Sequence, residues 1–126
     1  METNNRKNIK ILIVEDVAIV ARDIQESLHV LGYDNIDVAL DGAEALLLSQ
    51  KNKYDLILMD VKLEGSEKDG IEIAKIINNN IPIIYCTAYS DAKTIKRILN
   101  SPHLSYILKP FEVAKIKDII DAILLQ

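Results

Sequence analysis

Apolar positions along the chain alternate between short uninterrupted runs and longer helical repeats. An uninterrupted apolar run is typical of a strand covered on both faces. A helix instead repeats its apolar positions every three or four residues, as Val20, Ile24, Leu28 and Leu31 do before Gly32, which favours a helix end. On this basis we predict strands at 9–14, 36–39, 55–60, 83–87 and 104–108, and helices at 20–31, 43–51, 70–78, 92–99 and 112–125.

Five strand–helix repeats joined by short links predict the α/β class. Parallel strands need crossover connections, and helices supply them, so the pattern indicates a doubly wound five-stranded parallel sheet with helices on both faces. We expect the flavodoxin-like strand order 2-1-3-4-5. The helix at 70–78 should turn Ile73, Ile76 and Ile77 inward, and the apolar side chains on one side of the last helix are Val113, Ile116, Ile119, Ile120 and Ile123.

Length and composition fit one compact domain. The chain has 126 residues, 49% hydrophobic and 27% charged, which is enough for one core and too little for two domains. We expect residues 1–8 to form a flexible N-terminal segment and residues 9–126 a single domain with no output domain. Because the last helix ends without a capping residue, the sequence favours a piece of a longer protein over a stand-alone one.

Charge and cysteine content narrow the function classes. The net charge is -4 without a basic block, which argues against direct nucleic-acid binding. The single cysteine, Cys86, excludes an internal disulfide and, with no apolar leader, favours the cytoplasm. The apolar runs are too short to cross a bilayer.

Polar side chains follow four of the five predicted strands. Glu15 and Asp16 follow the first strand, and Asp60, Thr87 and Lys109 stand at the ends of the third, fourth and fifth. Ligands of such sheets bind beyond the carboxyl ends of the strands. We therefore expect these five side chains to lie together.

Three carboxylates at one edge need compensation, because each pair about 5 Å apart repels by roughly 3 to 4 kcal/mol at an effective dielectric near 20. One acid keeps its proton, Lys109 compensates, or a divalent cation binds. Oxygen-only donors favour Mg²⁺ over zinc. A carboxylate beside Mg²⁺ can attack phosphorus, and Asp60 is the candidate because it stands alone, with Thr87 and Lys109 offering donors to phosphoryl oxygens.

The same residues carry a family resemblance. The segments LIVED, LILMD, IIYCTA and YILKPF contain the acidic pair, Asp60, Thr87 and Lys109 in turn. With them, the chain from Ile9 to Leu125 resembles the receiver domains of two-component response regulators and hybrid histidine kinases. The loop after Asp60 is longer than in most of these domains and lacks their proline turn.

The resemblance implies a role for each matching position. Asp60 would take a phosphoryl group from a sensor histidine kinase or a phosphotransfer protein. Asp16, Asp60 and the backbone carbonyl of Lys62 would hold Mg²⁺ or Mn²⁺, with Glu15 acting through water. Such a domain is not an enzyme in the usual sense, since it catalyses only its own phosphorylation and dephosphorylation.

The resemblance also implies a conformational switch. Thr87 and Lys109 would contact the phosphoryl oxygens, and Tyr106 would turn inward when Thr87 moves toward the phosphate. A downstream effector, or a second copy of the chain in a homodimer, would bind the surface made by 92–99, 104–108 and 112–125.

Simpler interpretations exist for each residue. Glu15 and Asp16 could cap the first helix, Asp60 could be a turn residue, and Lys109 a solvated surface lysine. A haloacid-dehalogenase-type phosphatase would need an acid where Lys62 stands, and a flavin carrier would need a phosphate loop in place of the acidic pair. A receiver-like docking module that is never phosphorylated stays open.

Overall fold

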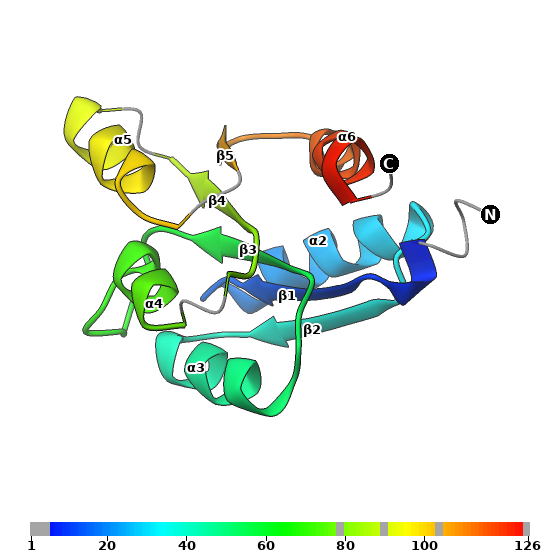
Figure 1. The fold of residues 1–126 in the computed structure, drawn as a ribbon, viewed down its shortest axis with the longest axis horizontal. Coiled ribbons are helices and arrows are strands. Elements are labelled where there is room, and N and C mark those ends of the chain that lie inside the picture. The colour runs from blue at the N-terminus through cyan, green and yellow to red at the C-terminus, as the bar shows by residue number, and fades with distance from the viewer. Residues whose placement is uncertain (1–5, 78–79, 89–90, 103–104, 125–126) are drawn as a thin grey trace.

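The computed structural model describes residues 6–77, 80–88, 91–102 and 105–124 (Figure 1). Within these ranges no helix is both long and apolar enough to cross a membrane. The strands are β1 (Lys10–Val14), β2 (Asn35–Ala39), β3 (Leu56–Asp60), β4 (Ile83–Thr87) and β5 (Ser105–Leu108). The helices are α2 (Ala18–Val30), α3 (Gly42–Lys51), α4 (Gly70–Ile77), α5 (Ala92–Leu99) and α6 (Val113–Leu124).

The strands form one five-stranded parallel sheet in the order β2-β1-β3-β4-β5, which confirms the predicted class and strand order. Asp60 pairs with Cys86 in the neighbouring strand, and Thr87 with Leu108. Because all strands run the same way, this register brings their carboxyl ends to one edge of the sheet.

Both faces of the sheet are covered, which explains why the central strands β1, β3 and β4 are nearly continuous apolar runs. Alternate side chains of each strand point to opposite faces. Helices α3, α4 and α5 pack on one face, and α2 and α6 on the other (Figure 1). The two cores include Leu12, Ile57, Met59 and Tyr85 on the first face, and Ile11, Ile13, Leu58 and Ile84 on the second.

The prediction of which α4 side chains face the core is partly wrong. Ile73 and Ile77 are buried as predicted, but Ile76 is 51% exposed. Ile71 and Ala74 take its place in the core. Successive helix residues are about 100° apart, so Ile76 points away from the sheet once Ile77 faces it. Asn78, the last residue of the predicted helix, lies outside the described residues.

The apolar side of α6 is shorter than predicted. Ile116 and Ile120 are fully buried and Val113 and Ile119 pack partly against them, whereas Ile123 is 47% exposed. Near the end of the helix, Asp121 binds polar partners, while Leu124 packs partly against the same core. Leu104 and Leu125, at the ends of a predicted strand and helix, lie outside the described residues.

Residues 6–8, within the segment expected to be flexible, form a helical turn that is fastened to α6. Arg6 donates through Nε and Nη2 to the two carboxylate oxygens of Asp121, at 3.3 and 2.9 Å. The hydroxyl of Tyr33 donates to Asp121 Oδ1 at 3.2 Å, and Lys117 Nζ to its Oδ2 at 2.7 Å. Asp121 therefore joins three segments that are distant in sequence.

This network predicts a pH-dependent contribution to stability. The hydrogen bond from Arg6 is the main cause that lowers the pKa of Asp121 to about 2. A carboxyl with a lowered pKa stabilises the fold above its unfolded pKa and loses that contribution as the pH falls through the folded value. We expect Asp121→Asn to lower the free energy of unfolding by about 1 kcal/mol at pH 7. The difference should shrink between pH 4 and about 2.

Urea unfolding at several pH values measures this effect. Asp118→Asn is the matched control, because it removes the same charge from an exposed position of the same helix. Equal losses in the two variants would contradict a specific role for Asp121.

Candidate functional site

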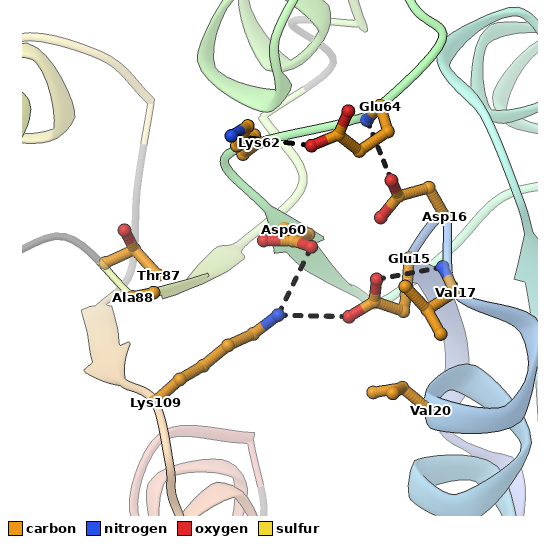
Figure 2. A pocket seen from close by; sticks show the side chains of 10 residues that line it. All are labelled: Glu15, Asp16, Val17, Val20, Asp60, Lys62, Glu64, Thr87, Ala88 and Lys109. Carbon is orange, nitrogen blue, oxygen red and sulfur yellow. Dashed lines mark hydrogen bonds and ion pairs between the residues drawn. The ribbon is translucent and has the colours of Figure 1, made fainter.

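The five polar residues expected at the strand ends meet in one pocket (Figure 2). Glu15 and Asp16 follow β1, Asp60 and Thr87 end β3 and β4, and Lys109 follows β5. The pocket is also lined by Val17, Val20, Lys62, Glu64 and Ala88.

Lys109 bridges two carboxylates. Its Nζ donates to Glu15 Oε1 at 3.1 Å and to Asp60 Oδ2 at 3.2 Å. The side chains of Glu15 and Asp60 are only 4% and 10% exposed, so the ammonium neutralises charge that water reaches poorly. The Lys109 backbone N–H donates to the Thr87 carbonyl at 2.8 Å, and the Lys109–Pro110 peptide bond is cis.

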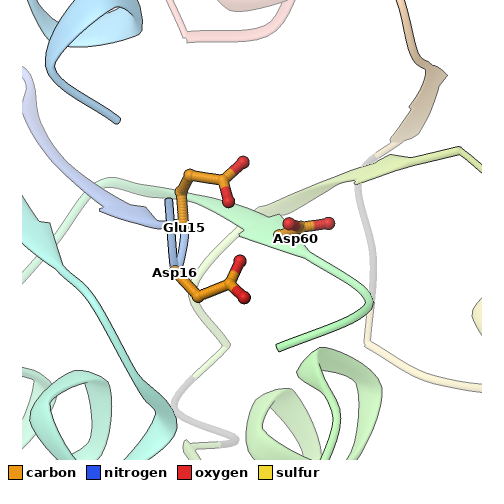
Figure 3. A group of neighbouring side chains, drawn as sticks. All are labelled: Glu15, Asp16 and Asp60. Carbon is orange, nitrogen blue, oxygen red and sulfur yellow. The ribbon is translucent and has the colours of Figure 1, made fainter. Parts of the chain in front are cut away.

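The three carboxylates converge on one point. Glu15, Asp16 and Asp60 each present an oxygen within 4.8 Å of the others. Figure 3 shows the carboxylates of Glu15 and Asp16, which follow β1, directed toward the same space as Asp60. The donors are all oxygens, and this is the set that hard cations such as Mg²⁺ prefer. The residues present therefore fit a magnesium ion.

Burial and mutual repulsion change the pKa values of these acids. Burial, and then the neighbouring Asp16, raise the pKa of Glu15 to about 7. Burial also raises the pKa of Asp60, although Lys109 offsets part of this effect. For Asp16, burial is outweighed by hydrogen bonds from Glu15 and the Glu64 amide, so its pKa is lowered. Of the three expected forms of compensation, the lysine is therefore present, and the raised pKa of Glu15 favours a retained proton.

The loop at 61–69 closes one side of the pocket. The backbone N–H of Glu64 donates to Asp16 Oδ2 at 2.8 Å, and the Lys62 ammonium lies 3.4 Å from the Glu64 carboxylate. Lys62 stands at the rim with its side chain 60% exposed. Glu64 was not among the predicted site residues, because a loop without apolar periodicity gives no signal of where its amides point.

Tyr106, the predicted switch residue, lies outside the pocket. It is on β5 beside Tyr85 and is 37% exposed, whereas the next residue, Ile107, is buried. The alternation along the strand turns Tyr106 toward the surface.

The capping interpretation of the acidic pair holds only in part. The N-cap of α2 is Val17, which has no side-chain cap, but Glu15 Oε2 accepts from the Val17 N–H at 3.1 Å. Asp16 contacts the loop at 61–69 instead. A role at the start of α2 therefore accounts only for Glu15 Oε2, and not for the other carboxylate oxygens of the pair.

The family model of the response regulator receiver domain matches residues 11–121. The chain belongs to this family. Its assignment as a receiver domain confirms the resemblance seen in the four sequence segments, and it replaces the phosphatase and flavin-carrier alternatives.

Known receiver-domain proteins resemble the chain over most of its length. It is 36% identical to the transcriptional regulatory protein PdtaR of Mycobacterium tuberculosis over 90% of the chain, and it spans 54% of the length of that relative. The chain is 32% identical to the chemotaxis protein CheY-3 of Vibrio cholerae, covering 98% of this chain and 97% of that protein. A crystal structure of a two-component response regulator from Clostridium difficile superposes with a TM-score of 0.86, at 31% identity, over 94% of this chain and 98% of that one.

Proposed function

We propose that this receiver domain is a phosphoacceptor of a two-component phosphorelay, with Asp60 as the acceptor. The observation that carries the proposal is the meeting of Asp60 with an acidic pair, a lysine and a threonine in one pocket. The donor would be the phosphohistidine of a sensor histidine kinase or of a phosphotransfer protein. A docking module would have no need for three mutually repelling acids.

The chain's own residues account for the main requirements of phosphoryl transfer. A carboxylate oxygen of Asp60 would attack phosphorus while the bond from phosphorus to the donor nitrogen breaks. The Lys109 ammonium lies 3.2 Å from Asp60. It would neutralise the negative charge as this charge moves from the Asp60 carboxylate to the phosphoryl oxygens. Thr87, buried at the same edge, would contribute its hydroxyl.

Mg²⁺, or Mn²⁺, would be held by Asp16, Asp60 and the backbone carbonyl of Lys62, with Glu15 close by. When bound, the ion would neutralise negative charge on the phosphoryl oxygens, as Lys109 also would. The Glu64 N–H donates to Asp16 Oδ2 at 2.8 Å and so fixes the carboxylate that would hold the ion.

The signal would leave through the surface made by α5, β5 and α6. Phosphorylation would shift Thr87 and Tyr106 and thereby favour one of two packings of these elements. Exposed apolar side chains on the three elements support a protein partner there, either an effector or a second copy of the chain; they are Leu99, Tyr106, Leu108 and Ile123. The acidic net charge supports a domain that does not bind nucleic acid directly, and the free thiol of Cys86 supports a cytoplasmic location.

Incubation with acetyl phosphate tests the proposal. We expect one phosphoryl group per chain by intact mass spectrometry, labile to hydroxylamine and absent when EDTA removes the metal. Asp16→Asn should require several-fold more Mg²⁺, because it removes one charged ligand. No uptake at all would favour the docking module, and uptake that is independent of metal would contradict the proposed magnesium site.

A further inference from the structure

The loop at 61–69 makes a contact beyond the pocket that the proposed function does not use. It begins directly after Asp60, lines the pocket through Lys62 and Glu64, and ends at Asp69. The Arg97 guanidinium of α5 lies 2.8 Å from Asp69 Oδ2. One short loop therefore connects the site edge to a helix of the expected output surface.

Asp69 is held in place independently of Arg97. Its Oδ1 accepts from the Glu72 N–H at 3.0 Å, and its own N–H donates to Glu72 Oε1 at 3.1 Å. These reciprocal bonds form a capping box at the start of α4. Since one carboxylate oxygen is fixed by the helix and the other faces α5, Arg97 binds a rigid anchor, and little side-chain freedom on the Asp69 side is lost.

Helix α5 is otherwise lightly attached to the domain. Ile98 is its one buried side chain among the described residues, and Ile95 packs partly against the core. At its end, the Tyr85 hydroxyl lies 3.1 Å from Ser101 Oγ and donates to the Pro102 carbonyl. A helix with so little buried surface can change position at low cost, so a single directed ion pair can bias it.

We propose that the Asp69–Arg97 ion pair couples the loop at 61–69 to α5, so that phosphorylation of Asp60 changes the position or mobility of α5 through this contact. The inference rests on the proposed function and deepens it. A change of the loop on phosphorylation would reach Asp69 at its end and alter the contact that Asp69 makes with Arg97. An ion pair at partly exposed side chains, 39% and 27% here, is weak, but allosteric coupling requires only a several-fold bias.

Four variants isolate the coupling. Arg97→Gln breaks the pair from α5. Asp69→Asn breaks it from the loop and keeps the cap, because Asn caps helices as well as Asp does. Arg97→Lys keeps a cation. Lys96→Gln is the matched control, since it removes the same charge from the neighbouring exposed position of α5.

The readout is amide hydrogen exchange of segment 92–99 before and after phosphorylation, with phosphoryl uptake measured in the same samples. We expect uptake within about twofold in all variants, while the change of exchange on phosphorylation falls by at least about fivefold in Arg97→Gln and Asp69→Asn. Arg97→Lys should recover part of it, and Lys96→Gln should behave like the unmodified chain.

Each failure has a distinct signature. Normal uptake together with an undiminished α5 response in Arg97→Gln and Asp69→Asn would overturn the coupling and leave the phosphoacceptor function intact. Absence of uptake in the unmodified chain would overturn both. If Arg97→Gln does not fold, Asp69→Asn alone decides, because it preserves the helix cap.

Discussion

Substitution of Asp60 by Asn is expected to abolish phosphorylation from acetyl phosphate and to make the metal-free domain more stable. The amide has the shape of the carboxylate and can still accept from Lys109, but it is too weak a nucleophile to form an acyl phosphate. The gain in stability arises because the folded chain disfavours ionised Asp60, whose pKa is raised by burial and only partly restored by Lys109.

The sign of this effect follows from linkage. A carboxyl with a raised folded pKa costs stability where it is ionised, and that cost disappears as the pH falls below the folded pKa. We expect Asp60→Asn to raise the free energy of unfolding by on the order of 1 kcal/mol at pH 7.5 without metal, and this gain should shrink as the pH falls through the folded pKa of Asp60.

Urea unfolding and mass spectrometry on the same samples measure both effects. Asp55→Asn is the control, because Asp55 is exposed at the opposite end of β3 and accepts from the Lys10 N–H at 2.8 Å. It should keep phosphorylation and lose a little stability. If Asp60→Asn instead lowered the free energy of unfolding, the ionised Asp60 carboxylate would not be destabilising the folded chain.

Substitution of Gly70 by Ala is expected to damage both the fold and the site. A Cβ at this position would overlap the carbonyl oxygen of Asp60 and come within 2.8 Å of Met59 Cγ. The Gly70 N–H also donates to the Val61 carbonyl at 2.7 Å, so α4 cannot simply move away. Either the Asp60 backbone or the start of α4 must shift.

The overlap should outweigh the better helix propensity of Ala. Overpacking costs about 1 to 3 kcal/mol, compared with a propensity gain of about 1 kcal/mol. A displacement of Asp60 by about 1 Å should lower the rate of phosphorylation by about a hundredfold.

Gly65→Ala is the control, because it also replaces a glycine by alanine but adds no clash with Asp60. Gly65 has φ 77° and no neighbouring atom within 4 Å of an added Cβ. It should lose about 1 kcal/mol of stability through local strain while keeping most of the phosphorylation rate. Equal rates for Gly70→Ala and the unmodified chain would contradict the close approach of α4 to Asp60.

The fold and the composition of the pocket were predictable because both depend on local patterns. Apolar runs, interrupted by Asp37 in the second strand and by Ser105 in the fifth, marked each strand to within two residues of its observed bounds wherever the structure describes them. Parallel strands have one common carboxyl edge, so listing the residues after each strand was sufficient to bring Asp16, Asp60 and Lys109 together.

Contacts that depend on tertiary placement were not predictable. The bond from the Glu64 amide to Asp16 arises from the path of a loop without periodicity, and the Arg6–Asp121 pair joins residues 115 positions apart. The exposure of Ile76 had the same origin, because the rotation of α4 is set by its packing on the sheet and not by its own composition. The two contacts hold the loop at 61–69 against the pocket and Arg6 against α6, where the apolar pattern of the sequence gives no signal.

The most direct measurement locates the phosphoryl group. Borohydride reduces an aspartyl phosphate to homoserine, which marks the modified residue through digestion and peptide sequencing by mass spectrometry. After incubation of the full chain with acetyl phosphate and Mg²⁺, homoserine should occur at position 60 and at no other aspartate. A phosphoryl group on a serine, threonine or histidine, or an unmodified Asp60, would contradict the role proposed for the pocket.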